Sequence, residues 1–433
     1  MKSKISGKTK NEVSLSWGIW FFCVLFLVSP ALFSQQTLNT IKGISFVKKP
    51  NNQFKEYYEV WVDQKLDHSN TESKSFKQRL FIGINNTAAP TVMETEGYAI
   101  SNTSLPSFMN GCNYISVEHR YFGRSQPDSL NWDHLTIQQA ASDLHHIRML
   151  FGQVFTGKWM TTGISKGGQT ALAYKVFFPE DVDATLAYVT PIKNSANDSR
   201  LLHFFQSISE TSCGKKVLAF QKLGFRNKAA LLNEFEDYIK EKKYTFSGMA
   251  HEKVLEYLLL EYPFAFYQNC LDCERIPDTT ALPIKILEEI MFAVPPKFFS
   301  DEFRSKLEPS FYMFYRELGY YEYDTSPFKQ WLSAENYSNN IFAPKNTSIT
   351  FDTNYLRSLN AFIRAASTDR IIFIYGENDP YTSTRPVFAN DNMCLVFVAK
   401  NGCHKSRIKD LTKEEQETIV GRLSKWLEWQ LTK

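Results

Sequence analysis

The chain has 433 residues, of which 43% are hydrophobic and 22% are charged, a composition that supports a sizeable globular core. It contains no low-complexity tract and no repeat of fixed period, which excludes a disordered chain and a solenoid. The formal charge of +3 comes from residues 1–35, which hold four lysines and one glutamate; the rest carries 45 basic and 45 acidic side chains. A neutral chain without a Lys/Arg cluster excludes nucleic acid and anionic membranes as expected partners.

The N-terminus has the pattern of a secretory signal peptide. Four lysines precede an apolar run from Trp17 to Phe33, and Ser34 and two glutamines follow. The alternative is a single-pass membrane anchor, which Pro30 and the small residue at the exit disfavour. We therefore expect residues 1–35 to be cleaved near Ser34, the mature chain to have no stable membrane span, and the protein to be exported, either to a periplasm or out of the cell.

The segment from about residue 55 to 190 has the sequence pattern of a βαβ architecture. Short runs rich in β-branched and aromatic residues alternate with turn signals and helical patterns. The runs predicted to be strands are 57–62, 78–84, 114–117 and 159–162. The clearest helix is 136–151, which starts with a Thr136-x-x-Gln139 capping box. We expect His145 and His146 on this helix to be partly exposed rather than metal ligands.

The sequence pattern changes after about residue 200. Long aromatic-rich helical patterns, such as 216–243 and 251–266, are broken by prolines near 283 and 295, which predicts an inserted helical cap over 201–345. After Thr350 the alternation of predicted strands and helices returns. We expect a helix over 354–366, strands over 371–375 and 395–399, and a final helix over 413–431. Residues 36–200 and 346–433 would form one sheet domain, interrupted by the cap.

Gly163-Ile164-Ser165-Lys166-Gly167 follows a predicted strand and opens a helical apolar run. Strand, tight turn and helix around such a serine are typical of the nucleophile elbow of an α/β-hydrolase fold. Small neighbours at Gly163 and Gly167 would let the strained turn expose the hydroxyl of Ser165, the predicted nucleophile. The backbone N–H of Lys166 would then face the developing oxyanion.

The acid and the base of this fold follow the serine in the chain. Of the eight histidines only His404 lies beyond the strand predicted at 371–375, so we assign it as the base. That strand runs into a turn that contains Asp379, the preferred acid, with Glu377 in reserve. His404 would take the proton of Ser165, and Asp379 would orient the imidazole and stabilise its charged form.

A second oxyanion donor should come from the loop after an early strand. Residues 91–98 predict a strand that ends in Glu96-Gly97, so the N–H of Gly97 or of a neighbour is the candidate. The HGGG loop that many lipases use is absent, which disfavours a lipase.

Six of the seven cysteines remain after the predicted leader is removed. An even number in an exported chain permits disulfides. Cys394 and Cys403 flank a predicted strand and loop, and their pairing would tether the segment that carries His404, although the sequence leaves the connectivity open. Cys270-x-x-Cys273 is half of a zinc motif, but no second pair accompanies it, so no metal is expected.

Several motifs together resemble the secreted prolyl tripeptidyl aminopeptidases, serine peptidases related to the Pro-X carboxypeptidase and dipeptidyl peptidase II family. The motifs that carry the resemblance are 95–98 (TEGY), 118–125 (EHRYFGRS), 163–168 (GISKGG), 178–184 (FPEDVDA) and 376–380 (GENDP). The resemblance spans most of the mature chain and matches Ser165, Asp379 and His404 to the family's triad. It implies an α/β-hydrolase domain with a helical cap, no cofactor, and release of short peptides, typically tripeptides, from free N-termini, often after proline. Tyr381 and Cys403 differ from the residues usual in the family.

An exopeptidase needs a carboxylate that holds the α-ammonium group of its substrate. The candidates are Glu94, Glu96 and Glu118, of which we rank Glu96 first. For Glu118 we favour a structural role, an internal charge pair in Glu118-His119-Arg120 that braces the loop behind the site.

Two other classes of function stay open. A carboxylester hydrolase would use the same triad, because the fold does not choose the leaving group. A non-catalytic exported binding protein would be signalled by loss of a triad residue or an elbow glycine, and the sequence keeps them all.

Overall fold

The computed structural model describes residues 38–100, 104–345, 347–365, 370–388 and 394–431. The predicted signal peptide and its cleavage site lie outside these residues. No helix in the described ranges is both long and apolar enough to cross a membrane.

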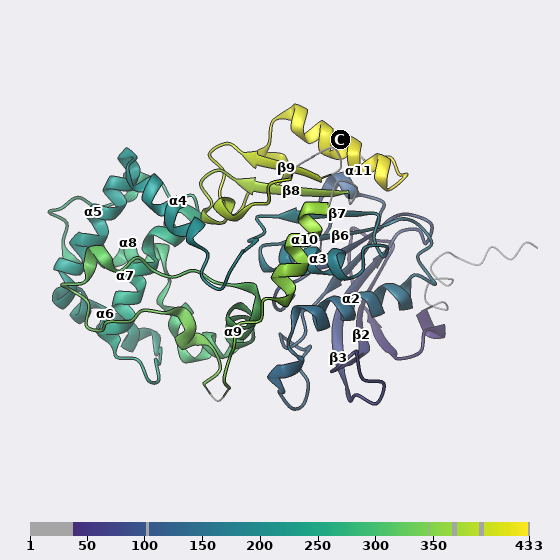
Figure 1. The fold of residues 1–433 in the computed structure, drawn as a ribbon, viewed down its shortest axis with the longest axis horizontal. Coiled ribbons are helices and arrows are strands. Elements are labelled where there is room, and N and C mark those ends of the chain that lie inside the picture. Colours follow the sequence, from purple (N-terminus) through teal and green to yellow (C-terminus); the bar gives the residue numbers. More distant parts are fainter. Residues whose placement is uncertain (1–37, 101–103, 346, 366–369, 389–393, 432–433) are drawn as a thin grey trace, which may run out of the picture.

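A nine-stranded sheet forms the centre of the molecule, in the order β1-β2-β3-β5-β4-β6-β7-β8-β9 (Figure 1). The strands are β1 (Ile44–Lys48), β2 (Glu56–Lys65), β3 (Ser75–Ile84), β4 (Thr91–Thr95), β5 (Asn113–Val117), β6 (Trp159–Ile164), β7 (Ala184–Tyr188), β8 (Ile371–Gly376) and β9 (Cys394–Ala399). β1, β2, β3 and β5 pair antiparallel, whereas all pairs from β5 to β9 are parallel. The carboxyl ends of β4 to β9 therefore share one edge of the sheet, where open α/β sheets bind ligands.

Helices cover both faces of this sheet, as expected for an α/β-hydrolase fold. On one face lie α2 (Ile137–Phe151), α3 (Lys166–Phe177) and α10 (Asn354–Ala365), and α11 (Lys413–Trp426) lies on the other (Figure 1). The apolar side chains of α11, such as Leu423, pack with Met160 and Leu186 of the sheet. Leu144 of α2 packs instead with Leu80 of β3. Burial of both apolar faces stabilises the three-layer arrangement and confirms the predicted fold class.

A group of helices inserted between β7 and β8 lies beside the sheet domain, on the left of Figure 1. These helices are α4 (Ser199–Ser209), α5 (Ser212–Arg226), α6 (Lys228–Lys242), α7 (His251–Gln268), α8 (Pro283–Ala293) and α9 (Asp301–Met313). They share an aromatic-rich core, centred on residues of α7 such as Leu258 and Tyr262. The helical insertion thus has a core of its own, which allows it to move relative to the sheet. Its predicted limits at 201 and 345 stay a prediction.

The helix predicted over 216–243 is two helices. The chain leaves helical geometry at Asn227 (φ −95°, ψ 11°), between α5 and α6. Both helices carry buried apolar stripes, Val217 and Phe220 on α5 and Leu231 and Phe235 on α6. The turn lets both stripes reach the same core, which a straight helix of that length would not allow. The last helix is also shorter than predicted and ends at Trp426.

Helix α7 continues through Pro263, which has no N–H to donate to the carbonyl of Leu259. The side-chain amide of Gln221 on α5 donates to that carbonyl instead (2.8 Å). This buried hydrogen bond satisfies the acceptor that proline leaves open.

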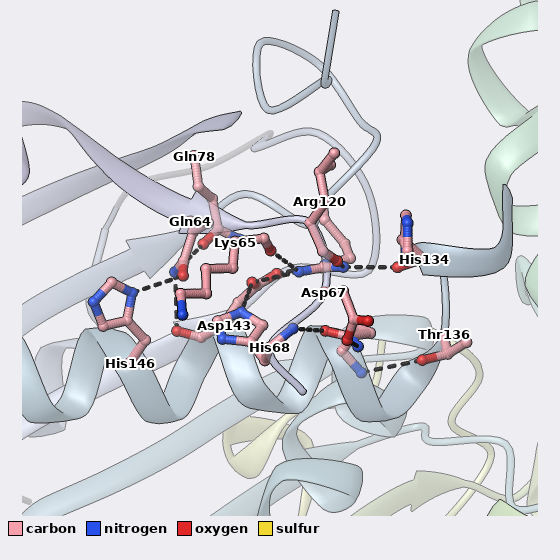
Figure 2. A network of polar contacts seen from close by, with 12 residues as sticks. Gln64, Lys65, Asp67, His68, Gln78, Arg120, His134, Thr136, Asp143 and His146 are labelled. Atoms are coloured by element: carbon pink, nitrogen blue, oxygen red, sulfur yellow. Dashed lines mark hydrogen bonds and ion pairs between the residues drawn. The ribbon is translucent and has the colours of Figure 1, made fainter. Parts of the chain in front are cut away.

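A buried polar network anchors the loop that follows β5 (Figure 2). The Arg120 guanidinium, fully buried, donates to both carboxylate oxygens of Asp143 on α2 (2.7 Å each) and to the carbonyls of Lys65, Leu66 and His134. Asp143 Oδ1 also lies 2.8 Å from His68 Nε2. A bidentate buried pair with its remaining donors satisfied fixes the loop rigidly against the sheet.

Glu118 does brace this loop, as predicted, but not through Arg120. Its carboxylate accepts hydrogen bonds from the backbone N–H of Arg124 (2.8 Å) and from the Ser125 hydroxyl (2.9 Å), and its cationic partner is Arg79 (3.7 Å). The two side chains belong to separate networks because Arg120 is committed to Asp143 on α2. On the same helix, His145 contacts Asp181 (2.7 Å) and His146 contacts Gln64 (2.8 Å).

Candidate active site

Ser165 stands on the sharp turn between β6 and α3. Its backbone has φ 55° and ψ −119°, a strained conformation for a residue other than glycine. Two backbone hydrogen bonds hold it there, from Ser165 N–H to the carbonyl of Tyr188 (2.8 Å) and from Gln169 N–H to the carbonyl of Ser165 (3.0 Å). The turn leaves Ser165 half-buried at the carboxyl edge of the sheet, at the N-terminus of α3. This is the geometry of a nucleophile elbow.

The glycines of the elbow are required by close backbone contacts. A Cβ on Gly163 would lie 2.3 Å from the carbonyl oxygen of Gly167, and one on Gly167 would lie 2.4 Å from that of Thr95. The Thr95 hydroxyl also donates to the carbonyl of Gly167 (2.8 Å). Any side chain at either glycine would therefore displace β4 or α3 from the elbow.

Asp379 and His404 meet at the same edge of the sheet. Asp379 follows β8 and is fully buried, and His404 follows β9 and is partly exposed. His404 Nδ1 lies 2.8 Å from Asp379 Oδ2. Glu377, the alternative candidate for the catalytic acid, instead accepts a hydrogen bond from the backbone N–H of Asn401 (2.8 Å). Because a carboxylate at Nδ1 fixes the ring and its tautomer, Nε2 is left as the nitrogen that can exchange a proton.

The pairing of Cys394 with Cys403, a possibility that the sequence left open, is not formed. Cys403 pairs with Cys270 and Cys213 pairs with Cys273, and Cys394 is buried at the start of β9. Cys394 begins β9 and Cys403 follows its end, so a six-residue strand of about 20 Å separates them, too far for a disulfide. The actual partner of Cys403 comes from the helical insertion, just after α7. The backbone N–H of His404 also donates to the carbonyl of Gln268, the last residue of α7 (3.1 Å).

The two residues predicted to form the oxyanion hole lie against each other. A Cβ on Gly97 would be 2.6 Å from Lys166 Cβ and 2.7 Å from Gly167 N, so the loop after β4 touches the start of α3. The buried Lys166 side chain closes the contact by donating to the carbonyl of Gly97 (2.8 Å). Its ammonium group also lies over the rings of Tyr98 and Phe122, and burial lowers its pKa to about 7. Lys166 thus links the elbow to the two neighbouring loops.

A small cavity of about 20 Å³ lies at Ser165. Its walls come from the elbow, from the loop after β7 and from the 314–320 segment of the insertion, and they are formed by Tyr98, Ser165, Lys166, Gln169, Pro191, Lys193, Phe314, Gly319, Tyr320 and Tyr381. Ligand sites for molecules of peptide size have volumes of several hundred Å³. This cavity alone is therefore smaller than a peptide-binding site.

Lys193 is the unexpected residue of this cavity. Its side chain is only 2% exposed, and among the described residues its ammonium nitrogen has no hydrogen-bond partner. It lies over the ring of Tyr381 at 5.0 Å, and burial lowers its pKa to about 7. A buried, unpaired donor beside the serine is suited to a polar group of a substrate.

The three carboxylates proposed for the substrate amine lie in different places. Glu118 is held in the loop behind the site, as described above. Glu96 lines a small cavity with Gln78 and Asp143, and is not among the residues around Ser165. Glu94 lines a separate pocket of about 600 Å³, where it accepts a short hydrogen bond from the Tyr114 hydroxyl and faces the guanidinium of Arg407.

Sequence reasoning missed a fourth carboxylate, Glu261. It lies on α7, is half-buried, and accepts hydrogen bonds from the hydroxyls of Tyr321 (2.8 Å) and Tyr323 (2.7 Å). Burial raises its pKa to about 7. No sequence motif marks either this residue or Lys193. Lys193 lines the cavity of Ser165 from the loop after β7, whereas Glu261 lies on α7 of the insertion.

A strained serine at the strand-to-helix turn of an α/β-hydrolase sheet, with a histidine and a buried carboxylate at the same edge, defines the class of serine hydrolases. The comparison with protein families narrows this class. Residues 30–431 match the family described as PS-10 peptidase S37, so the chain belongs to the S37 family of serine peptidases. This confirms the family suggested by the sequence motifs.

The names of two relatives agree with this family. The prolyl tri/tetrapeptidyl aminopeptidase of Streptomyces mobaraensis is 27% identical over 412 residues, which cover 92% of this chain and 86% of the relative. The probable serine protease EDA2 of Arabidopsis thaliana is 27% identical over 191 residues, 38% of each chain. Among solved structures, VinJ matches 89% of this chain and 98% of its own, with 11% identity and a TM-score of 0.38.

Proposed function

We propose that the protein is an exported serine peptidase that releases short peptides, typically tripeptides, from free N-termini and prefers proline before the cleaved bond. The observation that carries the proposal is the hydrogen-bonded pair of His404 and Asp379 at the sheet edge that also holds the strained Ser165. The preference for proline rests on the relative named a prolyl tri/tetrapeptidyl aminopeptidase.

In the proposed reaction His404 Nε2 accepts the proton of the Ser165 hydroxyl while Oγ attacks the substrate carbonyl. The new C–O bond converts the carbonyl oxygen to an oxyanion, which the backbone N–H groups of Lys166 and Gly97 stabilise. Collapse of this intermediate breaks the C–N bond, and the imidazolium gives its proton to the leaving amine. Water, activated by His404, then hydrolyses the acyl-enzyme and restores Ser165.

Asp379 acts through the imidazole. Its buried carboxylate holds the Nδ1 proton, so that Nε2 is left to accept the proton of the serine and the positive charge that forms on the ring is stabilised. The N-terminus of α3, which starts at Lys166, adds a favourable dipole at the developing oxyanion.

Two features support export. Residues 1–35 have the pattern of a signal peptide. The described chain also contains two disulfides, Cys213–Cys273 and Cys270–Cys403, which persist in oxidising compartments. We therefore propose a periplasmic or extracellular location and peptides as the substrates.

The test is to incubate the purified protein and its Ser165→Ala variant with a mixture of free and N-acetylated peptides and to identify the products by mass spectrometry. We expect serine-dependent release of tripeptides from free N-termini alone. Cleavage that persists in Ser165→Ala would refute the assigned nucleophile. Turnover of simple esters with no cleavage of any peptide would instead make the protein a carboxylesterase.

A further inference from the structure

Helix α7 of the insertion carries Glu261, a carboxylate that forms no ion pair among the described residues. Its partners are the hydroxyls of Tyr321 and Tyr323. The residue as a whole is partly exposed. A buried, uncompensated carboxylate is unfavourable by itself and is retained where a cation joins it.

The tyrosines that hold Glu261 adjoin the cavity of Ser165. Tyr320, which lines the cavity, directly precedes Tyr321 on the segment that also carries Tyr323. Phe264, one helical turn after Glu261, stacks on Tyr321 at 4.1 Å and contacts Tyr381 at 5.2 Å. Tyr381 in turn lies 5.6 Å from His404, ring to ring. Three ring contacts therefore connect Tyr321, a partner of Glu261, to the proposed catalytic histidine.

The length of helix α7 gives the spacing between Glu261 and the residue that contacts His404. The backbone N–H of His404 donates to the carbonyl of Gln268, seven residues after Glu261 on the same helix. At 1.5 Å per residue these seven residues correspond to about 10 Å along the helix axis. An extended peptide advances about 3.3 Å per residue, so three residues span about the same length.

We propose that Glu261, held by Tyr321 and Tyr323, binds the α-ammonium group of the substrate, and that α7 thereby sets the length of the released peptide at three residues. The inference deepens the proposed peptidase function and rests on it. Glu261 fits this role better than Glu94, whose carboxylate already faces Arg407, and better than Glu96, which lines a different cavity.

The experiment compares the wild-type protein with Glu261→Gln, which keeps the shape and the hydrogen-bond acceptor but removes the charge. The substrates are a tripeptidyl anilide with proline at the third position, its N-acetylated form, and forms one residue shorter and one longer. We expect Glu261→Gln to lower kcat/KM for the free tripeptidyl substrate by about 10- to 100-fold, the range for loss of one charged hydrogen bond. The acetylated substrate should be cleaved as slowly as by the wild type, and the preference for three residues should weaken.

Glu322→Gln is the matched control, because Glu322 is the exposed neighbour of Tyr321 and accepts a hydrogen bond from the Asn197 amide (2.7 Å). It should leave both the rate and the selectivity unchanged. Tyr323→Phe provides a second variant, which keeps the charge of Glu261 and should raise KM more than it lowers kcat.

The outcomes separate the two proposals. A wild type that selects free N-termini, together with a Glu261→Gln variant that selects them equally well, would overturn the role of Glu261 and leave the aminopeptidase function standing. A wild type that cleaves free and acetylated substrates alike would overturn both.

Discussion

Cys403, the residue before His404, is disulfide-bonded to Cys270, two residues beyond the end of helix α7, with 5.5 Å between the two Cα atoms. The hydrogen bond from His404 N–H to the carbonyl of Gln268 reinforces this link. The loop of the proposed general base is thus fastened to the helical insertion as well as to the sheet. Any movement of the insertion relative to the sheet would therefore act on this loop through α7.

The first prediction concerns this disulfide. Replacing Cys270 and Cys403 by serine should lower kcat, because the loop that carries the imidazole loses its covalent link to the insertion. The replacement should also lower the free energy of unfolding by about 3 to 5 kcal/mol, since the disulfide closes a loop of 133 residues. Steady-state kinetics and urea unfolding measure the two effects. The control is Cys213→Ser with Cys273→Ser, which removes a bridge inside the insertion and should reduce stability with a smaller loss of kcat. Equal kinetic losses in both pairs would argue against a specific role for Cys270–Cys403.

The second prediction concerns the buried pair Arg120–Asp143. Asp143→Ala leaves a fully buried guanidinium without its carboxylate and should lower the free energy of unfolding by about 3 to 5 kcal/mol. The exposed pair Lys306–Glu302 provides the comparison, where Glu302→Ala should leave stability nearly unchanged. Chemical denaturation of both variants checks the contrast, and similar losses in the two would contradict it.

The third prediction concerns Lys193, whose buried ammonium group lacks a hydrogen-bond partner among the described residues. Lys193→Met keeps the side-chain volume and removes the desolvated charge, so the free energy of unfolding should rise by about 1 to 3 kcal/mol. Activity on peptides should fall, because the same ammonium group faces the cavity of Ser165. Urea unfolding and kcat/KM are measured on one preparation. A variant that is less stable, or that is fully active, would contradict the assignment of Lys193 to substrate binding.

The fourth prediction concerns Glu317, which lies under the first turn of α2 and accepts the backbone N–H of Ile137. Burial raises its pKa from 4.5 to about 7. Between these values the folded chain binds more protons than the unfolded chain, so this group makes the protein less stable as the pH rises through the window. Below about pH 4.5 the carboxyl is protonated in both states and has no such effect.

Glu317→Gln removes this titration. The stability of the variant relative to the wild type should therefore increase from about pH 4.5 to about pH 7 and stay constant above that range. Denaturant unfolding of both proteins across the window tests the slope, and all groups common to the two chains cancel in the difference. A constant difference in stability would show that Glu317 ionises as readily in the folded chain as in the unfolded one.

Local patterns in the sequence predicted the sheet domain well. Thr136 caps the start of α2 as predicted, although the Gln139 side chain bonds Asp67 and His68 instead of completing the capping box. The apolar runs that precede Ser165 and Asp379 are the strands β6 and β8. These predictions succeed because alternating or helical burial and turn chemistry act within a few residues. The same locality explains the error at Asn227, where a helical pattern continues through a turn that only the shared core of α5 and α6 requires.

The sequence by itself determined the family, the fold class and the three residues proposed for catalysis, because their order along the chain and their place after successive strands follow from the parallel sheet. Tertiary structure decided everything that the insertion contributes. Cys270 and Gln268 contact the loop of His404 although more than a hundred residues separate them from it in the chain, through the packing of α7 beside the carboxyl edge of the sheet. No local pattern encodes such contacts, since they depend on how two separately formed cores come together.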